Sequence, residues 1–338
     1  MEFVRLDPTD NVVTATRALA ADVTIDGVQV TGMVPSGHKI ATAPIAEGEA
    51  VRKYAQVIGY ASQAIAPGDH VHTHNVDFRA TDASYEFSTD LRPVKPVPED
   101  RRDTFMGYKR DNGSVGTRNY IAIVTSVNCS ATAARMIADH FTPDILADYP
   151  NVDGVAAFVH GTGCGMASDG PGWDNLQRVL WGYATHPNVG AALFVGLGCE
   201  IMQIARMKHM LDATGNERFH GLTIQDSGGT KQTIASIVAK VKEMLPEVNA
   251  ANRSPCPLSD LSVALQCGGS DGYSGLTANP ALGAASDLLV GHGGQVILAE
   301  TPEIYGAEDL LLERAANDDV GHALVERLRW WESHTAMN

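Results

Sequence analysis

The chain has 338 residues, 44% of them hydrophobic and 19% charged, so it can bury more than one hydrophobic core. Its net charge of −15, with no segment that gathers Lys or Arg, argues against a nucleic-acid partner. Its longest apolar stretches, such as 190–198, are about half of a membrane span, and its charged start does not resemble a signal peptide. Five widely spaced cysteines fit a reducing compartment. We therefore expect a soluble, cytoplasmic protein with no membrane partner.

The first 80 residues predict a small β-rich module, because short apolar segments alternate with turn residues such as those at 35–39. Residues 81–104 are polar and rich in proline, with no sustained helix or strand period. This composition predicts an extended linker.

Residues 105–338 predict a doubly wound α/β body with a largely parallel sheet, because β-branched apolar segments alternate with segments of helical period. The expected strands are 120–127, 155–160, 191–195, 222–224, 261–265 and 295–299. The expected helices are 131–141, 173–184, 202–213, 231–245, 281–291 and 307–315. In such sheets ligands bind outside the carboxyl ends of the strands.

Four cysteines follow predicted strands: Cys129, Cys164, Cys199 and Cys267. The first three are separated by two intervals of 35 residues, about one βα unit, which indicates equivalent positions facing one crevice. Cys129 also directly precedes a predicted helix, a position that lowers the pKa of a thiol. One interpretation is that each cysteine is a small buried apolar residue. The other is that the thiolates hold iron or an iron–sulfur cluster, although the intervals are far from the tight spacing of common cluster sites.

Three alternating histidines, His70, His72 and His74, form a second candidate site. On a strand they share one face, with neighbours roughly 7 Å apart, and two such rings can bind one divalent metal ion. The alternative is a polar, solvated strand face. His38 in the same module is a further candidate ligand.

Acidic residues stand at the late strand ends, namely Asp226, Asp271, Glu300 and Glu303. Carboxylates there can bind a hard cation or orient a base. They can equally cap helices that follow glycine-rich turns.

These residues lie within motifs that occur in order along the chain. The motifs are Asp10-Asn11-Val12, Gly37-His38-Lys39, Lys53-Tyr54, Ile58-Gly59-Tyr60, the segment His70 to Asn75, Gly107-Tyr108, Gly113 to Asn119, Val127-Asn128-Cys129, Gly163-Cys164, Gly196 to Glu200, Gln266 to Asp271, Ser274-Gly275, Thr277 to Pro280 and Glu300 to Glu303. With them, the whole chain resembles the altronate/galactarate dehydratase family of sugar-acid hydro-lyases, with an N-terminal SAF (β-clip) module. The histidine run resembles the altronate branch more than the galactarate branch.

The resemblance implies dehydration of a linear sugar acid, altronate first and galactarate second, to a 2-keto-3-deoxy acid. It implies a divalent metal, Fe²⁺ before Mn²⁺, with His72, His74 and His38 as ligands and the cysteine loops as the opposite wall. The expected catalytic residues are His70, Lys39, Cys129 and Asp271. The expected substrate-binding residues are Arg118, Asn119, Asn128, Cys164, Glu200, Gly268, Gly269 and Ser270. Either His70 or Lys39 can act as acid or base, and Arg118 either grips a carboxylate or forms a surface ion pair.

Two other functions are compatible with the sequence. One is a related β-elimination, such as loss of sulfite from a sulfonated hydroxy acid, and the other is sugar-acid binding without turnover. Nucleotide binding is not expected, because no G-x-G-x-x-G follows the first strand and no P-loop motif occurs. Because sequences of the family extend well beyond the position of Asn338, we expect the family's C-terminal part to be missing. We also expect a homo-oligomer.

Overall fold

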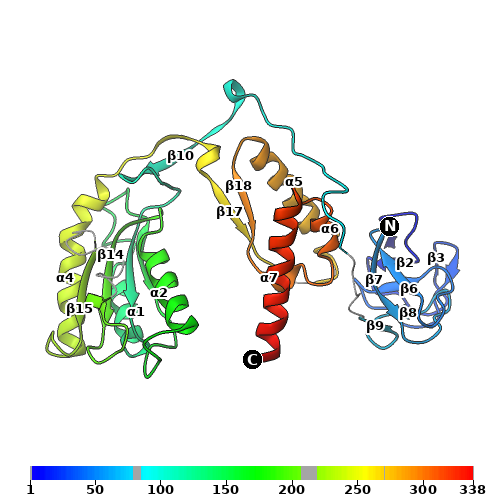
Figure 1. The fold of residues 1–338 in the computed structure, drawn as a ribbon, viewed down its shortest axis with the longest axis horizontal. Coiled ribbons are helices and arrows are strands. Elements are labelled where there is room, and N and C mark those ends of the chain that lie inside the picture. The colour runs from blue at the N-terminus through cyan, green and yellow to red at the C-terminus, as the bar shows by residue number, and fades with distance from the viewer. Residues whose placement is uncertain (1, 79–84, 207–218, 270, 338) are drawn as a thin grey trace. The chain divides into compact units, whose positions relative to one another are not determined.

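The computed structural model of the chain describes residues 2–78, 85–206, 219–269 and 271–337 (Figure 1). It divides into two compact units. The first unit combines Met1–Val97 with Ser262–Asn338, and the second is Pro98–Leu261. The predicted body of residues 105–338 is therefore shared between the two units.

The N-terminal part of the first unit contains only short strands. They are β1 (Phe3–Val4), β2 (Val12–Ala15), β3 (Thr24–Ile25), β4 (Val28–Gln29), β5 (Lys39–Ala41), β6 (Ala50–Lys53), β7 (Gln56–Ala61), β8 (His70–Val71) and β9 (Val76–Asp77). They form antiparallel sheets in the orders β1-β2-β5-β8 and β6-β7-β9 and the hairpin β3–β4. Neighbouring residues of β2, Val12 and Val13, enter two separate apolar clusters, as the alternation of a strand requires. The predicted β-rich module is confirmed.

The second unit is an α/β domain around a parallel sheet. Its elements are η1 (Glu99–Arg101), β10 (Thr104–Lys109), β11 (Val115–Gly116), β12 (Tyr120–Thr125), η2 (Asn128–Ser130), α1 (Ala131–His140), β13 (Gly154–Phe158), α2 (Pro171–Ala184), β14 (Val189–Gly196), β15 (Phe219–Thr223), α4 (Thr230–Asn249), β16 (Ser254–Pro257) and η3 (Leu258–Asp260). Four parallel strands lie in the order β13-β12-β14-β15. The predicted helix 202–213 falls largely on residues outside those described.

Helices cover both faces of this sheet, which is why its strands are almost continuously apolar. Ile121 and Ile123 of β12 pack in a cluster with α1 and α4. Ala122 and Val124, which point the other way, pack in a cluster with α2. In Figure 1 α4 and α2 lie on opposite sides of the sheet. The doubly wound arrangement is thus confirmed for these four strands.

A three-stranded antiparallel sheet, β11-β10-β16, joins two distant parts of the second unit. The sequence did not predict β10 or β16. β16 reads Ser-Pro-Cys-Pro, and prolines argue against a strand in the interior of a sheet. Among the residues that the structure describes, β16 pairs only with β10, at the edge of its sheet.

The C-terminal part of the first unit holds the remaining elements: β17 (Ser262–Leu265), α5 (Ala278–Gly291), β18 (Gln295–Leu298), η4 (Thr301–Glu303), α6 (Asp309–Leu312) and α7 (Asp318–Met337). β17 and β18 were predicted as strands of the main parallel sheet. Within the described residues they pair in parallel only with each other. The strand–helix–strand spacing predicts such a pair, but it does not say which sheet the pair joins.

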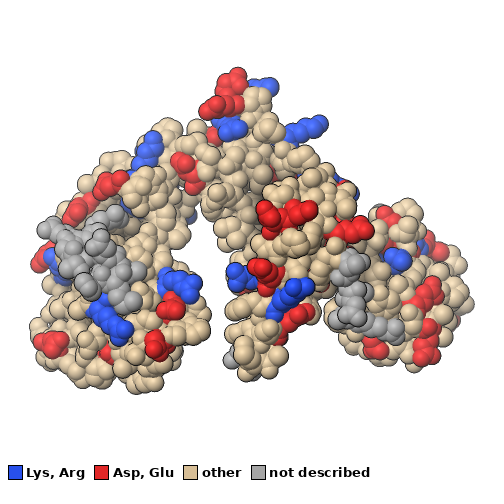
Figure 2. All heavy atoms as spheres, in the orientation of Figure 1, with Lys and Arg blue, Asp and Glu red and all other residues tan. Residues whose placement is uncertain are grey.

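None of the helices in the described ranges has the length and apolarity required to cross a bilayer. On the face drawn in Figure 2, acidic side chains alternate with basic ones, and that face shows no continuous basic surface. The expectation of no nucleic-acid partner stays a prediction.

Candidate functional site

Four imidazoles of the N-terminal module lie side by side, and we call His38, His70, His72 and His74 the histidine cluster. The Nδ1 atom of His38 and the Nε2 atom of His70 are 2.9 Å apart, within hydrogen-bond distance. The ring centroids of His38 and His72 are 4.8 Å apart in a stacked arrangement, and those of His70 and His74 are 5.2 Å apart. The structure therefore brings together all four histidines that the sequence singled out.

A turn, rather than a long strand, gathers these rings. β8 ends at Val71, and the buried Asn75 side chain closes the following turn. Its Oδ1 accepts the backbone N–H of His72 at 3.0 Å, and its Nδ2 donates to the carbonyl of His70 at 3.0 Å. The sequence correctly predicted that these histidines lie together. It was wrong to place His70, His72 and His74 on one strand, because only His70 lies in β8.

The surroundings of two of these histidines, His70 and His72, favour the neutral imidazole. Burial, followed by the charges of the neighbouring histidines and of Lys39, lowers the pKa of His70 to about 4. Burial also lowers the pKa of His72, with smaller contributions from His38, Lys39 and His74. At neutral pH both rings can therefore accept a proton.

Two half-buried lysines belong to the same neighbourhood. Burial is the main reason that the pKa of Lys39 in β5 is lowered, and the charge of Lys53 lowers that pKa further. Burial likewise lowers the pKa of Lys53 in β6, where the carboxylate of Asp10 acts in the opposite direction. Sequence reasoning assigned no role to Lys53, although Lys53-Tyr54 was among the matched motifs. Two half-buried amines, one of which disfavours the charge of the other, form a candidate site for an anionic ligand.

The loop after β17 packs on the turn that carries His38. The Oδ1 of Asp271 accepts the backbone N–H groups of Tyr273 at 2.7 Å and Ser274 at 3.1 Å, and these bonds lower the pKa of its carboxyl. The hydroxyl of Tyr273 bonds to Ser36 and donates to the carbonyl of Thr16 at 3.0 Å. Asp271 thus holds the turn that places Tyr273 beside Gly37. A Cβ added to Gly37 would lie 3.5 Å from the ring of Tyr273.

Three further residues of this loop were predicted to bind substrate. Gly268 and Gly269 are exposed. Ser270 lies outside the described residues.

A single metal ion does not fit the described arrangement. The family resemblance implies a divalent metal ion, and imidazole nitrogens are suitable ligands for such an ion. Within the described ranges, however, no three His, Cys, Asp or Glu side chains are placed to hold one. In the histidine cluster two nitrogens face each other and two rings stack, so their donors do not converge on one point. No step proposed below passes through a metal at this cluster.

In the second unit, Cys129, Cys164 and Cys199 follow the carboxyl ends of β12, β13 and β14, and we call these three residues the cysteine edge. All three are exposed free thiols. Burial raises the pKa of Cys129, and the neighbouring Cys164 and Cys199 side chains raise it further. The lowered pKa that its position before a helix predicted is therefore wrong, because these surroundings disfavour the thiolate. The structure therefore brings three of the four cysteines to one edge of the sheet, and a crevice lined by them stays a prediction. Cys267 follows β17 in the first unit and is not on this sheet edge.

Hydrogen bonds fix the loops of the cysteine edge to one another. The backbone N–H of Asn128 donates to the carbonyl of Thr162 at 2.9 Å, which joins the Cys129 and Cys164 loops. The buried Glu200 accepts the Ser126 hydroxyl at 2.7 Å and the Gly198 N–H at 2.6 Å, which joins the Cys129 and Cys199 loops. Glu200 was predicted to bind substrate, and in the structure both its carboxylate oxygens bond to the protein.

Two other predicted substrate residues lie at the opposite edge of the sheet. Arg118 pairs with Asp153 at 3.3 Å, the surface ion pair that was one of its two interpretations. The buried Asn119 donates to the carbonyls of Asn151 at 2.8 Å and Val248 at 2.9 Å. β12 has six residues, so it separates these side chains from the cysteine edge by about 17 Å.

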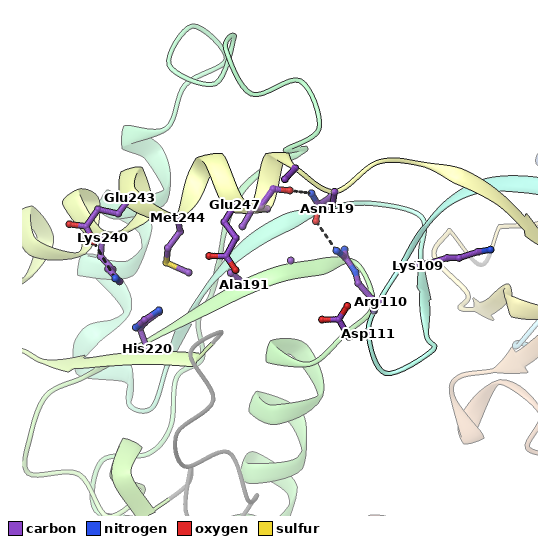
Figure 3. A pocket seen from close by; sticks show the side chains of 14 residues that line it. Lys109, Arg110, Asp111, Asn119, Ala191, His220, Lys240, Glu243, Met244 and Glu247 are labelled. Atoms are coloured by element: carbon purple, nitrogen blue, oxygen red, sulfur yellow. Dashed lines mark hydrogen bonds and ion pairs between the residues drawn. The ribbon is translucent and has the colours of Figure 1, made fainter.

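A pocket of about 700 Å³ lies near Asn119, at the amino ends of β12, β14 and β15 (Figure 3). Arg110 enters it and donates to the side-chain oxygen of Asn119 at 3.0 Å, while Lys240 and Glu243 pair on α4. Ligands of doubly wound sheets bind at the other edge. This pocket is therefore a weaker candidate site than the cysteine edge.

Three stretches of the chain match domains of one family. Residues 1–79 match the altronate/galactarate dehydratase SAF domain. Residues 107–249 match the second domain of D-galactarate dehydratase/altronate hydrolase, and residues 258–338 match the D-galactarate/altronate dehydratase C-terminal domain. The chain belongs to the altronate/galactarate dehydratase family.

Relatives within this family are similar over nearly the whole chain. The sequence is 36% identical to the altronate dehydratase of Bacillus subtilis (strain 168), over 96% of this chain and 65% of that protein. It is also 36% identical to the galactarate dehydratase (L-threo-forming) of Escherichia coli (strain K12), over 99% of this chain and 66% of that protein. The chain thus spans slightly less than two thirds of these relatives, and the equal identities do not separate the two substrates.

A more distant relative matches part of the chain. The (2R)-sulfolactate sulfo-lyase subunit beta of Chromohalobacter salexigens is 35% identical over 64% of this chain and 51% of that subunit.

Proposed function

We propose that the protein is a hydro-lyase that removes water from a linear sugar acid, altronate first and galactarate second, and forms a 2-keto-3-deoxy acid. The observation that carries this proposal is the combination, in one module, of neutral imidazoles with two half-buried lysines of lowered pKa. This combination provides both a base and a cationic site for the substrate carboxylate. The dehydratase relatives support the same reaction class.

The first step removes the proton on the carbon next to the carboxylate. Lys39 is the base of this proposal, because burial and Lys53 favour its neutral form. Within the described part of the chain its amine makes no hydrogen bond or ion pair. His70 is less suited, because its Nε2 already bonds to His38 and its pKa of about 4 makes it a weak base.

The second step expels the hydroxyl from the neighbouring carbon. The carbon–hydrogen electron pair forms the new double bond, and the carbon–oxygen bond breaks. The proton taken by Lys39 passes to the departing oxygen, directly or through the imidazoles, so water leaves and the amine is regenerated. The enol then tautomerises to the keto acid.

Negative charge develops on the substrate during proton removal and must be stabilised. Lys53, half-buried beside Lys39, is the candidate cation in this structure. The proposal also includes a divalent metal, Fe²⁺ before Mn²⁺, to which neither step above is assigned. Metal dependence is a separate part of the proposal, supported by the family resemblance and tested by chelation.

The test is an anaerobic assay of 2-keto-3-deoxy acid formation from altronate and from galactarate, with and without Fe²⁺. Lys39→Met should lower the rate by about 100-fold or more, the typical contribution of a general base. The matched control is Lys231→Met, an exposed lysine at the start of α4, which should retain the rate. Equal rates for the two variants would rule out Lys39 as the base.

A sulfo-lyase function is the second candidate, because a sulfolactate sulfo-lyase subunit matches much of the chain. It shares the proton-removal step but expels sulfite. Sulfite release from sulfolactate, without product from altronate, would replace the first proposal by this one. Sugar-acid binding without turnover of either substrate would instead indicate a binding protein.

The proposal includes a small-molecule sugar acid as the ligand and a homo-oligomeric, cytoplasmic protein. Light scattering of the purified chain tests the oligomeric state. A single-chain mass would contradict that part.

A further inference from the structure

Another cavity, in the first unit, is not used by the dehydration steps proposed above. It has a volume of about 570 Å³ and is lined by β7 and by the segment 305–310. Every lining residue that the structure describes belongs to the first unit. Five of them are aromatic, namely Tyr54, Tyr60, Phe78, Tyr85 and Tyr305. A cavity lined by aromatic rings with a few polar groups is typical of a small-molecule site.

Tyr54 has a backbone conformation that tyrosine rarely adopts. Lys53 of β6 pairs with Gln56 of β7, so Tyr54 and Ala55 form the two-residue turn between these strands. Their φ angles are 62° and 59°, the left-handed values of a turn that usually carries Asn-Gly. The carboxylate of Asp10 accepts the Ala55 N–H at 2.8 Å and helps to hold the turn. Asparagine would relieve this strain, so its presence indicates a function for the tyrosine ring.

Two glycines let aromatic rings of the cavity take their places. A Cβ on Gly275 would lie 2.5 Å from the hydroxyl oxygen of Tyr54. A Cβ on Gly306 would lie 2.9 Å from the ring of Phe78. Either side chain would therefore have to move a ring. Phe78 nevertheless remains 64% exposed, so its ring is available to a ligand.

Charged groups of opposite sign lie at and beside the cavity. The ammonium group of Lys53 lies 4.6 Å from the centroid of the Tyr54 ring. Among the described residues that line the cavity, Glu308 and Asp309 are acidic and none is Lys or Arg. A ligand with a carboxylate at one end only can place it at Lys53 and its neutral end in the cavity.

The polar groups of the cavity are arranged to accept hydrogen bonds. The Tyr85 hydroxyl donates to Glu308 at 2.9 Å, and the Tyr305 hydroxyl donates to Glu332 at 2.9 Å. The backbone N–H of Gly306 donates to the other oxygen of Glu308 at 2.5 Å. Burial and the Glu308 carboxylate raise the pKa of Tyr85 to about 12. Because both hydroxyl protons are used, the tyrosine oxygens can accept from ligand hydroxyls but cannot donate to a ligand carboxylate.

We propose that this cavity binds the neutral polyhydroxy end of an aldonate, a sugar acid with one carboxylate, and disfavours an aldarate, which has a carboxylate at both ends. The ligand hydroxyls donate to Tyr85, Tyr305 and Asp309, and its C–H groups lie against the Tyr54 ring. An aldarate would place its second carboxylate beside the acidic residues of the lining, and like charges repel. The inference rests on the proposed function, because it takes from it the binding of the first carboxylate at Lys53.

An organic cation is the other kind of ligand that aromatic rings and carboxylates can bind. The ammonium group of Lys53 already lies over the Tyr54 ring. It would repel a second cation there, whereas it attracts the carboxylate of an aldonate. The charges therefore favour the aldonate.

The experiment compares altronate, an aldonate, with galactarate, an aldarate. Isothermal titration calorimetry of the full chain gives the ratio of dissociation constants, and the ratio of kcat/KM values replaces it where the chain turns over. The parent should prefer altronate by about tenfold. Asp309→Asn should reduce this preference about three- to fivefold by tightening galactarate. Asp287→Asn, the same change of charge at an exposed position of α5, should leave the preference unchanged.

A second variant tests the ring. Tyr54→Asn gives the turn a residue that it favours, and it should weaken altronate binding by about tenfold because the aromatic contact is lost. Circular dichroism melts show whether each variant is folded. If Tyr54→Asn does not fold, the preference of Asp309→Asn decides.

A parent chain that binds neither acid, or binds both equally, would overturn the inference. So would a preference that Asp309→Asn leaves unchanged, or an unchanged altronate affinity in folded Tyr54→Asn. Tetramethylammonium binding that Tyr54→Asn abolishes, in a chain that does not bind altronate, would make the cavity an organic-cation site instead. The dehydratase function fails separately. Selective binding of altronate that depends on Tyr54 and Asp309, without turnover of either acid, upholds the cavity and removes the proposed function. Turnover of both acids without preference does the reverse.

Discussion

At the scale of single residues, the chemistry of the first unit depends on which side chains are charged. His70 is neutral at physiological pH because its surroundings combine burial with several groups that become positive. Burial and the positive charge of Lys53 likewise lower the pKa of Lys39. Both shifts can be measured through the pH dependence of stability and of rate.

His70 should make the protein sensitive to acid. Its pKa is about 4 in the folded chain and 6.5 as the ordinary value, so between these values the unfolded chain binds more protons. The free energy of unfolding should therefore fall as pH drops from 6.5 to 4. His70→Gln removes this contribution and should lose less stability than the parent between neutral pH and the pKa of His70. Urea titrations at the two pH values measure this, and identical losses in both proteins would contradict the shift.

Lys53 should control the pH at which Lys39 becomes a base. The positive charge of Lys53 lowers the pKa of Lys39, so Lys53→Met should raise it. The acidic limb of the kcat profile should then move to higher pH, because a larger fraction of Lys39 stays protonated. KM for the sugar acid should also rise, since the carboxylate loses a cation. A profile that stays in place would show that Lys39 is not the titrating base.

Sequence reasoning identified the histidines and Lys39 because they form a dense local motif. It gave no role to Lys53 or Tyr273, whose position depends on pairing between segments far apart in the chain. Tyr273 lies next to residue 37 only because the loop after β17 packs on the N-terminal module. Such a contact leaves no periodic signal in a single sequence.

At the scale of elements, the turn after β8 positions the histidines. Asn75 is buried and uses both ends of its amide on the backbone of His70 and His72. The strand alternation assumed from sequence would have spread the rings along one face. The turn instead brings the His70 and His74 rings within 5.2 Å of each other.

Asn75→Ala should therefore disturb stability and activity together. Removing the acceptor of the half-buried His72 N–H should cost about 1 kcal/mol in the free energy of unfolding. Asn75→Asp is the matched variant, because it keeps an acceptor for this N–H and loses only the amide donor. Denaturant titrations should rank the parent above Asn75→Asp and Asn75→Ala last. A stable but inactive Asn75→Ala would mean that the turn has a purely catalytic role.

The parallel strands β12 to β15 were predictable because strands covered on both faces must be apolar. The antiparallel pair β10–β16 was not, because proline-rich β16 has no strand pattern. The separation of β17 and β18 from the main sheet was also not predictable. It depends on which partner a strand finds in space, and spacing along the chain does not carry that information.

At the scale of the whole molecule, the parallel sheet of the second unit and the β17–β18 pair of the first unit differ in how well they are covered. β12 and β14 are almost completely buried between helices, whereas β17 and β18 are largely exposed or only half-buried. Local stability follows such burial. The chain should therefore open at β17 and β18 long before the main sheet opens.

Hydrogen exchange followed by mass spectrometry tests this difference. The amides of β12 and β14 should exchange most slowly, near the rate of global unfolding, and those of β17 and β18 much faster. Equal protection of both sheets in the purified chain would show that another surface covers β17 and β18.

The most direct test of the central claim follows the substrate hydrogen. We would incubate altronate with the protein in heavy water and examine the product by nuclear magnetic resonance. The account predicts a 2-keto-3-deoxy acid that carries one solvent deuterium at the new methylene carbon, and no such product with Lys39→Met. A product without solvent deuterium there, or the same yield from Lys39→Met, would contradict proton removal by Lys39 followed by loss of water.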